Sequence, residues 1–184
     1  MILLVLGLGL WSAAHLMPQL APGLHARLGK RSRPVITVAV LLGLLLMILG
    51  YLGWDSEYHR TPAAWTRHLN NLMMLIAVYL FAASGARTRL AVALRHPQLL
   101  AVSLWSGAHL LANGSWSALV LFGGIGGWAV LEMALLDARK PSPIPTAPAT
   151  MARELRAAII AVVVFILIGL VHGWIGPNPF GAMS

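Results

Sequence analysis

The sequence contains no cysteine among its 184 residues, and only 10% of the residues are charged. The missing thiols exclude disulfides, iron–sulfur clusters and covalent attachment of c-type haem, because all of these depend on cysteine. The scarcity of charge excludes an ordinary soluble domain, in which about a quarter of the residues are charged. Any bound metal must therefore be held by nitrogen or oxygen ligands.

Apolar residues are abundant: they make up 59% of the chain, and the mean hydropathy is +0.80. Six apolar stretches each approach the roughly 20 residues that a helix needs to cross the hydrocarbon core of a bilayer. They cover about residues 2–18, 35–53, 65–84, 97–113, 116–136 and 157–175. The sequence therefore predicts an all-α, polytopic transmembrane bundle of about six helices, with the lipid bilayer as its main partner.

The basic residues predict how this bundle is oriented. Eleven of the 13 Lys and Arg residues fall in the segments 27–33, 87–95 and 139–156, while Arg60 and Arg67 lie on the other side. Cytoplasmic loops carry such an excess, so both termini are expected to face the periplasm, with the chain in the bacterial inner membrane. The net charge of +8 is then explained by orientation, and no nucleic-acid partner is expected.

Residues 140–150 form the one low-complexity segment, with four prolines. Such a composition favours an extended linker over a helix, so we expect a cytoplasmic connection before the last helix. Nothing else divides the chain, and residues 1–184 are expected to form a single transmembrane domain.

Two histidines, His15 and His109, lie deep inside apolar stretches. An ionisable side chain at membrane depth predicts a functional site, although a hydrogen bond between helices would also satisfy it. Because cysteine is absent, haem iron is the first metal to consider. At about 1.5 Å per residue, His15 and His109 are offset in depth by about 10 Å, whereas His68, His109 and His172 all fall toward the outer half. This depth count leaves His68 as a rival partner for His109.

Short motifs are spread along nearly the whole chain. They are Ala14-His15-Leu16, Arg67-His68-Leu69, Arg95-His96-Pro97-Gln98, Leu104-Trp105 with Ala108-His109, Asn113-Gly114, and His172-Gly173-Trp174-Ile175-Gly176. In this order they resemble the NnrU proteins, bacterial membrane proteins associated with denitrification gene clusters and related to the plant zeta-carotene isomerase.

The resemblance implies a b-type haem held by two histidines, which match His15 and His109 and so favour His15 over His68. In the plant relative, redox change at the iron is coupled to isomerisation of a polyene. That isomerase has a cysteine where this sequence has Ser106, and a further histidine near residues 50–51, where this sequence has none. These departures weaken isomerisation as the activity and leave haem binding intact.

A haem also needs partners for its carboxylates and its macrocycle. Cations and hydrogen-bond donors near the membrane surfaces suit the carboxylates. The outer-side candidates are Arg67, His68 and Asn113, and the inner-side candidates are Arg95 and His96. Trp105 is a candidate for packing on the macrocycle.

Three functions follow, in order of preference. The first is a haem-b protein with a redox role in nitrogen-oxide respiration, either passing electrons to respiratory or denitrification proteins or responding to nitric oxide. The second is a haem isomerase of a lipophilic polyene. The third is a haem-free assembly or scaffold protein of a respiratory complex. No acid–base pair or nucleophile stands out, so enzyme and non-enzyme roles both stay open. Glu132 would be a candidate proton-handling group if buried, but its place near Asp137 and the cytoplasmic surface favours a solvated side chain.

Overall fold

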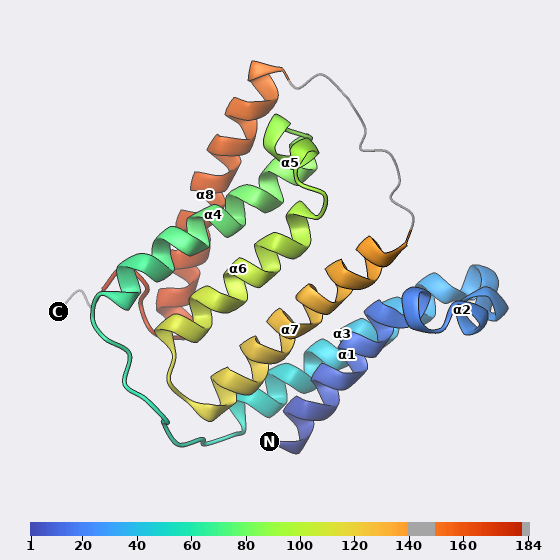
Figure 1. Ribbon diagram of the computed structural model, residues 1–184. Coiled ribbons are helices and arrows are strands. Elements are labelled where there is room, and N and C mark those ends of the chain that lie inside the picture. The colour runs from blue at the N-terminus through green and yellow to red at the C-terminus, as the bar shows by residue number, and fades with distance from the viewer. Residues whose placement is uncertain (140–149, 182–184) are drawn as a thin grey trace. The chain divides into compact units, whose positions relative to one another are not determined.

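The computed structural model describes residues 1–139 and 150–181 (Figure 1). The long helices are α1 (Ile2–Leu20), α3 (Ser32–Leu52), α4 (Thr66–Ala86), α6 (Pro97–Ala112), α7 (Trp116–Ala138) and α8 (Met151–Ile175). The short helices α2 (Pro22–Leu28) and α5 (Arg89–Ala93) and a 3-10 turn at Gly29–Arg31 lie between them. Within these residues the only β pairing is one isolated bridge between Tyr58 and Ser115. The predicted all-α class is confirmed.

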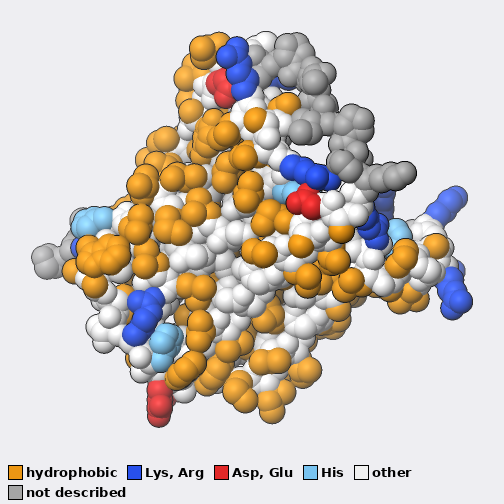
Figure 2. Space-filling view, viewed as in Figure 1, with side chains coloured by type: hydrophobic (Ala, Val, Ile, Leu, Met, Phe, Trp, Pro, Cys, Tyr) orange, Lys and Arg blue, Asp and Glu red, His pale blue; other side chains and the backbone are white. Residues whose placement is uncertain are grey.

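Five helical segments of the described chain are long and apolar enough to cross a membrane: Ile2–Leu20, Pro22–Leu52, Thr66–Ala86, Trp116–Ala138 and Met151–Ile175. The remaining predicted span forms α6, whose 16 residues extend about 24 Å, less than the roughly 30 Å hydrocarbon core. Hydrophobic side chains cover much of the visible surface (Figure 2), and those of α8 such as Ile159 and Leu167 stay about half exposed. The chain is a helical membrane protein.

The helix ends differ from the ends of the apolar stretches. Helix α8 begins at Met151, six residues before the predicted start, and α1 continues through Pro18 to Leu20. Hydropathy marks the lipid-embedded part of a helix, whereas a helix can continue into the polar interface. There Glu154 accepts a hydrogen bond from the backbone N–H of Arg89 at 2.8 Å. Most of the predicted linker, residues 140–149, lies outside the described residues.

The described chain forms two compact units. Unit 1 comprises residues 1–61 and 113–139, and unit 2 comprises residues 62–112 and 150–181. In unit 1, α1 lies along α3 and also contacts α7. Glycines allow this close approach: a Cβ atom on Gly7 would lie 2.6 Å from the Met47 backbone nitrogen and 2.7 Å from the Gly43 carbonyl oxygen. Small residues at such positions are how membrane helices gain contact area.

In unit 2, α4 packs against both α6 and α8 (Figure 1). The chain that follows α8 folds back on this unit. Asn71 donates a hydrogen bond from Nδ2 to the Pro179 carbonyl oxygen at 2.8 Å, and the Phe180 ring lies 5.7 Å from the ring of Phe165. This return fixes the end of α8 against the start of α4.

Gly7→Leu should destabilise unit 1, because its Cβ atom would meet backbone atoms that cannot move aside. We expect a loss of about 1 to 3 kcal/mol, seen as a lower thermal unfolding midpoint of the detergent-solubilised protein. Gly9→Leu is the matched control, since a Cβ atom there meets nothing within 4 Å. Equal unfolding midpoints for the two variants would contradict the α1–α3 contact.

Candidate functional site

The His15 ring is fixed by its own helix. Its Nδ1 atom lies 2.9 Å from the carbonyl oxygen of Trp11, one turn earlier in α1. Because a carbonyl oxygen only accepts hydrogen bonds, Nδ1 carries the proton and Nε2 carries the lone pair. The ring also lies between two indoles, with centroids 4.1 Å from Trp11 and 5.0 Å from Trp128. The imidazole is therefore held in one orientation and one tautomer.

His109 in α6 has the same arrangement in unit 2. Its Nδ1 atom lies 3.0 Å from the Trp105 carbonyl oxygen, and the two rings lie 4.7 Å apart. The adjacent small residues Ser106 and Ala108 are buried, at 1% and 0% exposure. This bond again assigns the proton to Nδ1 and the lone pair to Nε2, which is the form of histidine that binds metals.

The two histidines share more than this geometry. Residues 10–16 read Leu-Trp-Ser-Ala-Ala-His-Leu, and residues 104–110 read Leu-Trp-Ser-Gly-Ala-His-Leu, so the segments differ at one position. This repeat is not among the features predicted above, although aligning the surroundings of the two histidines reveals it. It explains why a tryptophan carbonyl anchors each imidazole, and it gives each unit one copy of the same tryptophan–histidine segment.

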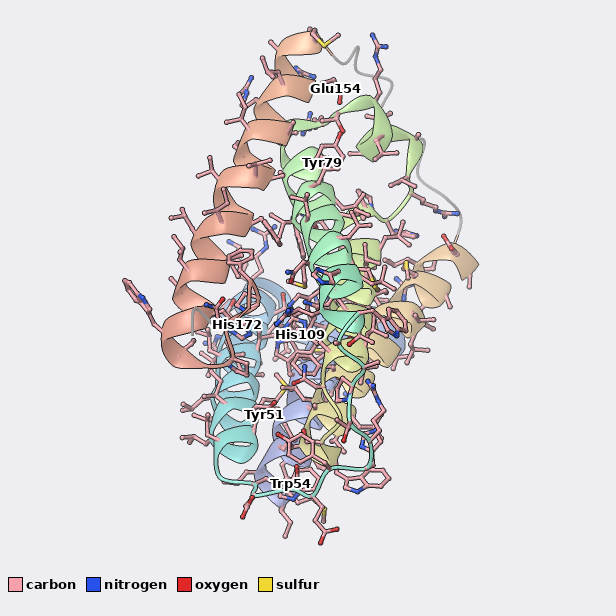
Figure 3. The ribbon with its side chains drawn as sticks, turned by 90° about the vertical axis from the view of Figure 1, so that its left-hand side faces the viewer. Tyr51, Trp54, Tyr79, His109, Glu154 and His172 are labelled. Carbon is pink, nitrogen blue, oxygen red and sulfur yellow. The ribbon has the colours of Figure 1, made fainter. Side chains whose placement is uncertain are left out.

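His172 lies beside His109; the depth count placed both toward the outer half but did not single out this contact. It lies near the end of α8, and its ring centroid is 6.4 Å from that of His109, with an angle of 63° between the rings (Figure 3). The predicted rival His68 and its neighbour Arg67 are exposed at the start of α4. The contact itself comes from packing, because α6 and α8 each pack on α4.

The other predicted residues are spread over both units. Trp105 lies beside His109 as expected. Arg95, which is exposed, and the half-buried His96 lie at the opposite end of α6, about 20 Å along the helix axis from His109. Asn113 belongs to unit 1, where its carbonyl oxygen accepts a hydrogen bond from Arg60 Nη2 at 2.9 Å.

Glu132 differs from its prediction. The side chain is half-buried and does not extend into bulk solvent: its Oε2 atom is buried, and its Oε1 atom accepts a hydrogen bond from Gln19 Nε2 at 3.4 Å. The prediction was wrong because proximity to the end of a helix does not expose a side chain that faces a neighbouring helix, here α1.

The donor set suits some metal centres better than others. Among residues 1–139 and 150–181, no three histidine, aspartate or glutamate side chains lie close enough to hold a bare metal ion together. A haem would need fewer protein ligands than a bare metal ion, because its porphyrin supplies four nitrogen ligands to the iron. Two imidazoles whose Nδ1 protons are held by backbone carbonyls fit that requirement.

The family model described as NnrU protein matches residues 3–179. A search of curated proteins and a search of solved structures each found no match. The family match covers nearly the whole chain, including both copies of the tryptophan–histidine repeat and His172. The chain belongs to the NnrU protein family.

Proposed function

We propose that this protein binds haem b through His15 and His109 and serves a redox role in the membrane. The observation that carries the proposal is the repeated segment, which gives each unit an imidazole with its Nδ1 proton donated to a tryptophan carbonyl oxygen. Under this proposal His15 and His109 would be the protein's ligands to the haem iron, and residues 1–184 would act as one domain.

Haem, when bound, supplies one-electron redox chemistry at its iron. The protein supplies orientation and surroundings. The backbone hydrogen bonds hold both rings in place and increase the basicity of Nε2. The indoles of Trp11 and Trp105 keep water from one side of each imidazole. Two strong axial ligands favour electron transfer over the binding of a gas or substrate, and the resemblance to NnrU proteins suggests respiratory or denitrification proteins as electron partners.

The proposed site is tested by visible absorption of the purified protein, oxidised and reduced with dithionite. Wild-type protein should show a Soret band with sharp reduced α and β bands. His15→Ala and His109→Ala should lose this low-spin spectrum, because each removes one axial ligand. His25→Ala is the control, since His25 lies in the short helix α2 outside both repeats.

Two results would contradict the proposal. A colourless wild-type protein that takes up no added haem would exclude both haem-dependent functions. The haem-free scaffold role would then be the remaining one of the three functions. Loss of the low-spin spectrum in His68→Ala, with the spectrum of His15→Ala unchanged, would replace His15 by His68 as the partner of His109. Turnover of zeta-carotene by the haem-loaded protein would favour the isomerase role.

We further propose six membrane crossings, including α6, with both termini on the periplasmic side of a bacterial inner membrane. The distribution of basic residues supports this orientation. Single cysteines can test it because the chain has none of its own. Thr61→Cys should react with an impermeant maleimide in intact cells, whereas Ala26→Cys should react only after permeabilisation. The reverse pattern would invert the orientation.

A further inference from the structure

Polar side chains follow the contact between α1 and α7 in unit 1. His15 and Gln19 are four residues apart on α1, and Trp128 and Glu132 are four residues apart on α7, so each pair shares one face of its helix. The pairs face each other: the rings of His15 and Trp128 lie 5.0 Å apart, and Gln19 Nε2 lies 3.4 Å from Glu132 Oε1. We call these four residues the polar row.

Three buried atoms of the polar row have no hydrogen-bond partner within residues 1–139 and 150–181. They are the donor Trp128 Nε1 and the acceptors Gln19 Oε1 and Glu132 Oε2. Trp128 itself is only 9% exposed. A buried polar atom without a partner is destabilising, so such atoms are nearly always satisfied by protein or by ordered water. One donor and two acceptors in one row match a small molecule that both donates and accepts.

The backbone of α1 adds a further acceptor that needs a hydrogen-bond donor. Pro18 lies inside the helix and has no N–H, so it cannot make the regular hydrogen bond to the carbonyl oxygen of Ala14. A carbonyl freed in this way inside a membrane is tolerated where a neighbouring group or water satisfies it. The interruption falls between His15 and Gln19, which is the section of α1 that carries the polar row.

At the Gln19 end of the polar row lies an exposed cation. Arg139 is exposed, and its Nη2 atom donates hydrogen bonds to the carbonyl oxygens of Pro18 at 3.1 Å and Gln19 at 2.8 Å. From Leu20, the last residue of α1, to His15 the distance along the helix axis is about 8 Å. Two or three water molecules in contact would span about that length.

We infer that a water-filled path runs along the polar row from Arg139 to His15. Water satisfies the Trp128 indole N–H, the Gln19 amide oxygen and the free oxygen of Glu132. The path does not depend on haem binding. Under the proposed function, it would carry water and protons from one membrane surface to the His15 side of the site without crossing lipid.

Single cysteines test the path, because charged methanethiosulfonate reagents modify the thiolate, which forms only in contact with water. We expect Gln19→Cys and Glu132→Cys to react at least about tenfold faster than Leu131→Cys, because water lines the path and not the lipid-facing side of α7. Leu131 is the matched control, since it neighbours Glu132 on α7 and is 46% exposed. Each variant is used only if its unfolding midpoint equals that of wild type.

Equal rates for Glu132→Cys and Leu131→Cys would overturn the inference. A second measurement needs no variant: hydroxyl radicals produced by radiolysis of water oxidise side chains next to bound water. Trp128 should be oxidised although it is buried, together with the exposed Trp65. Oxidation of Trp65 without Trp128 would also overturn the inference. Neither measurement involves haem, so a colourless protein would refute the proposed function and leave this result unaffected.

Discussion

The scarcity of water inside a membrane forces every polar group there to find a partner, and most features of this protein follow from that constraint. Helices satisfy their own backbone, which explains the all-α fold. Imidazoles inside such helices need partners too, and His15 and His109 each bond to a carbonyl oxygen of their own helix. The same constraint therefore fixes the orientation of both rings.

The two tryptophan–histidine segments are equivalent locally and differ in their surroundings. His15 lies between two indoles and belongs to the polar row of unit 1. His109 lies beside one indole and a second imidazole, that of His172. Nearly identical segments therefore hold their imidazoles in two different chemical environments.

The sequence predicted the helices well and their ends less well. The length of the apolar stretches identified every long helix, because a helix that crosses lipid needs about 20 apolar residues. The start of α8 at Met151 depends instead on polar contacts such as that between Glu154 and Arg89. The shared hydrogen-bond partner of the two histidines could also have been predicted, since residues 10–16 and 104–110 repeat the same pattern. The neighbours of His172 and Glu132 could not be predicted from the sequence, because contacts between helices far apart in sequence determine them.

The order of the helices along the chain affects how the protein can be assembled. Unit 1 needs α7, which is synthesised after α4 and α6, and unit 2 needs α8, which is synthesised last. Neither unit is a continuous stretch of chain. Domains usually fold one after another as they leave the ribosome. Here α1 and α3 are synthesised before the helices of the other unit, and α7 joins them only after α4 and α6. The contact between Asn71 and Pro179 forms only after α8 has been synthesised.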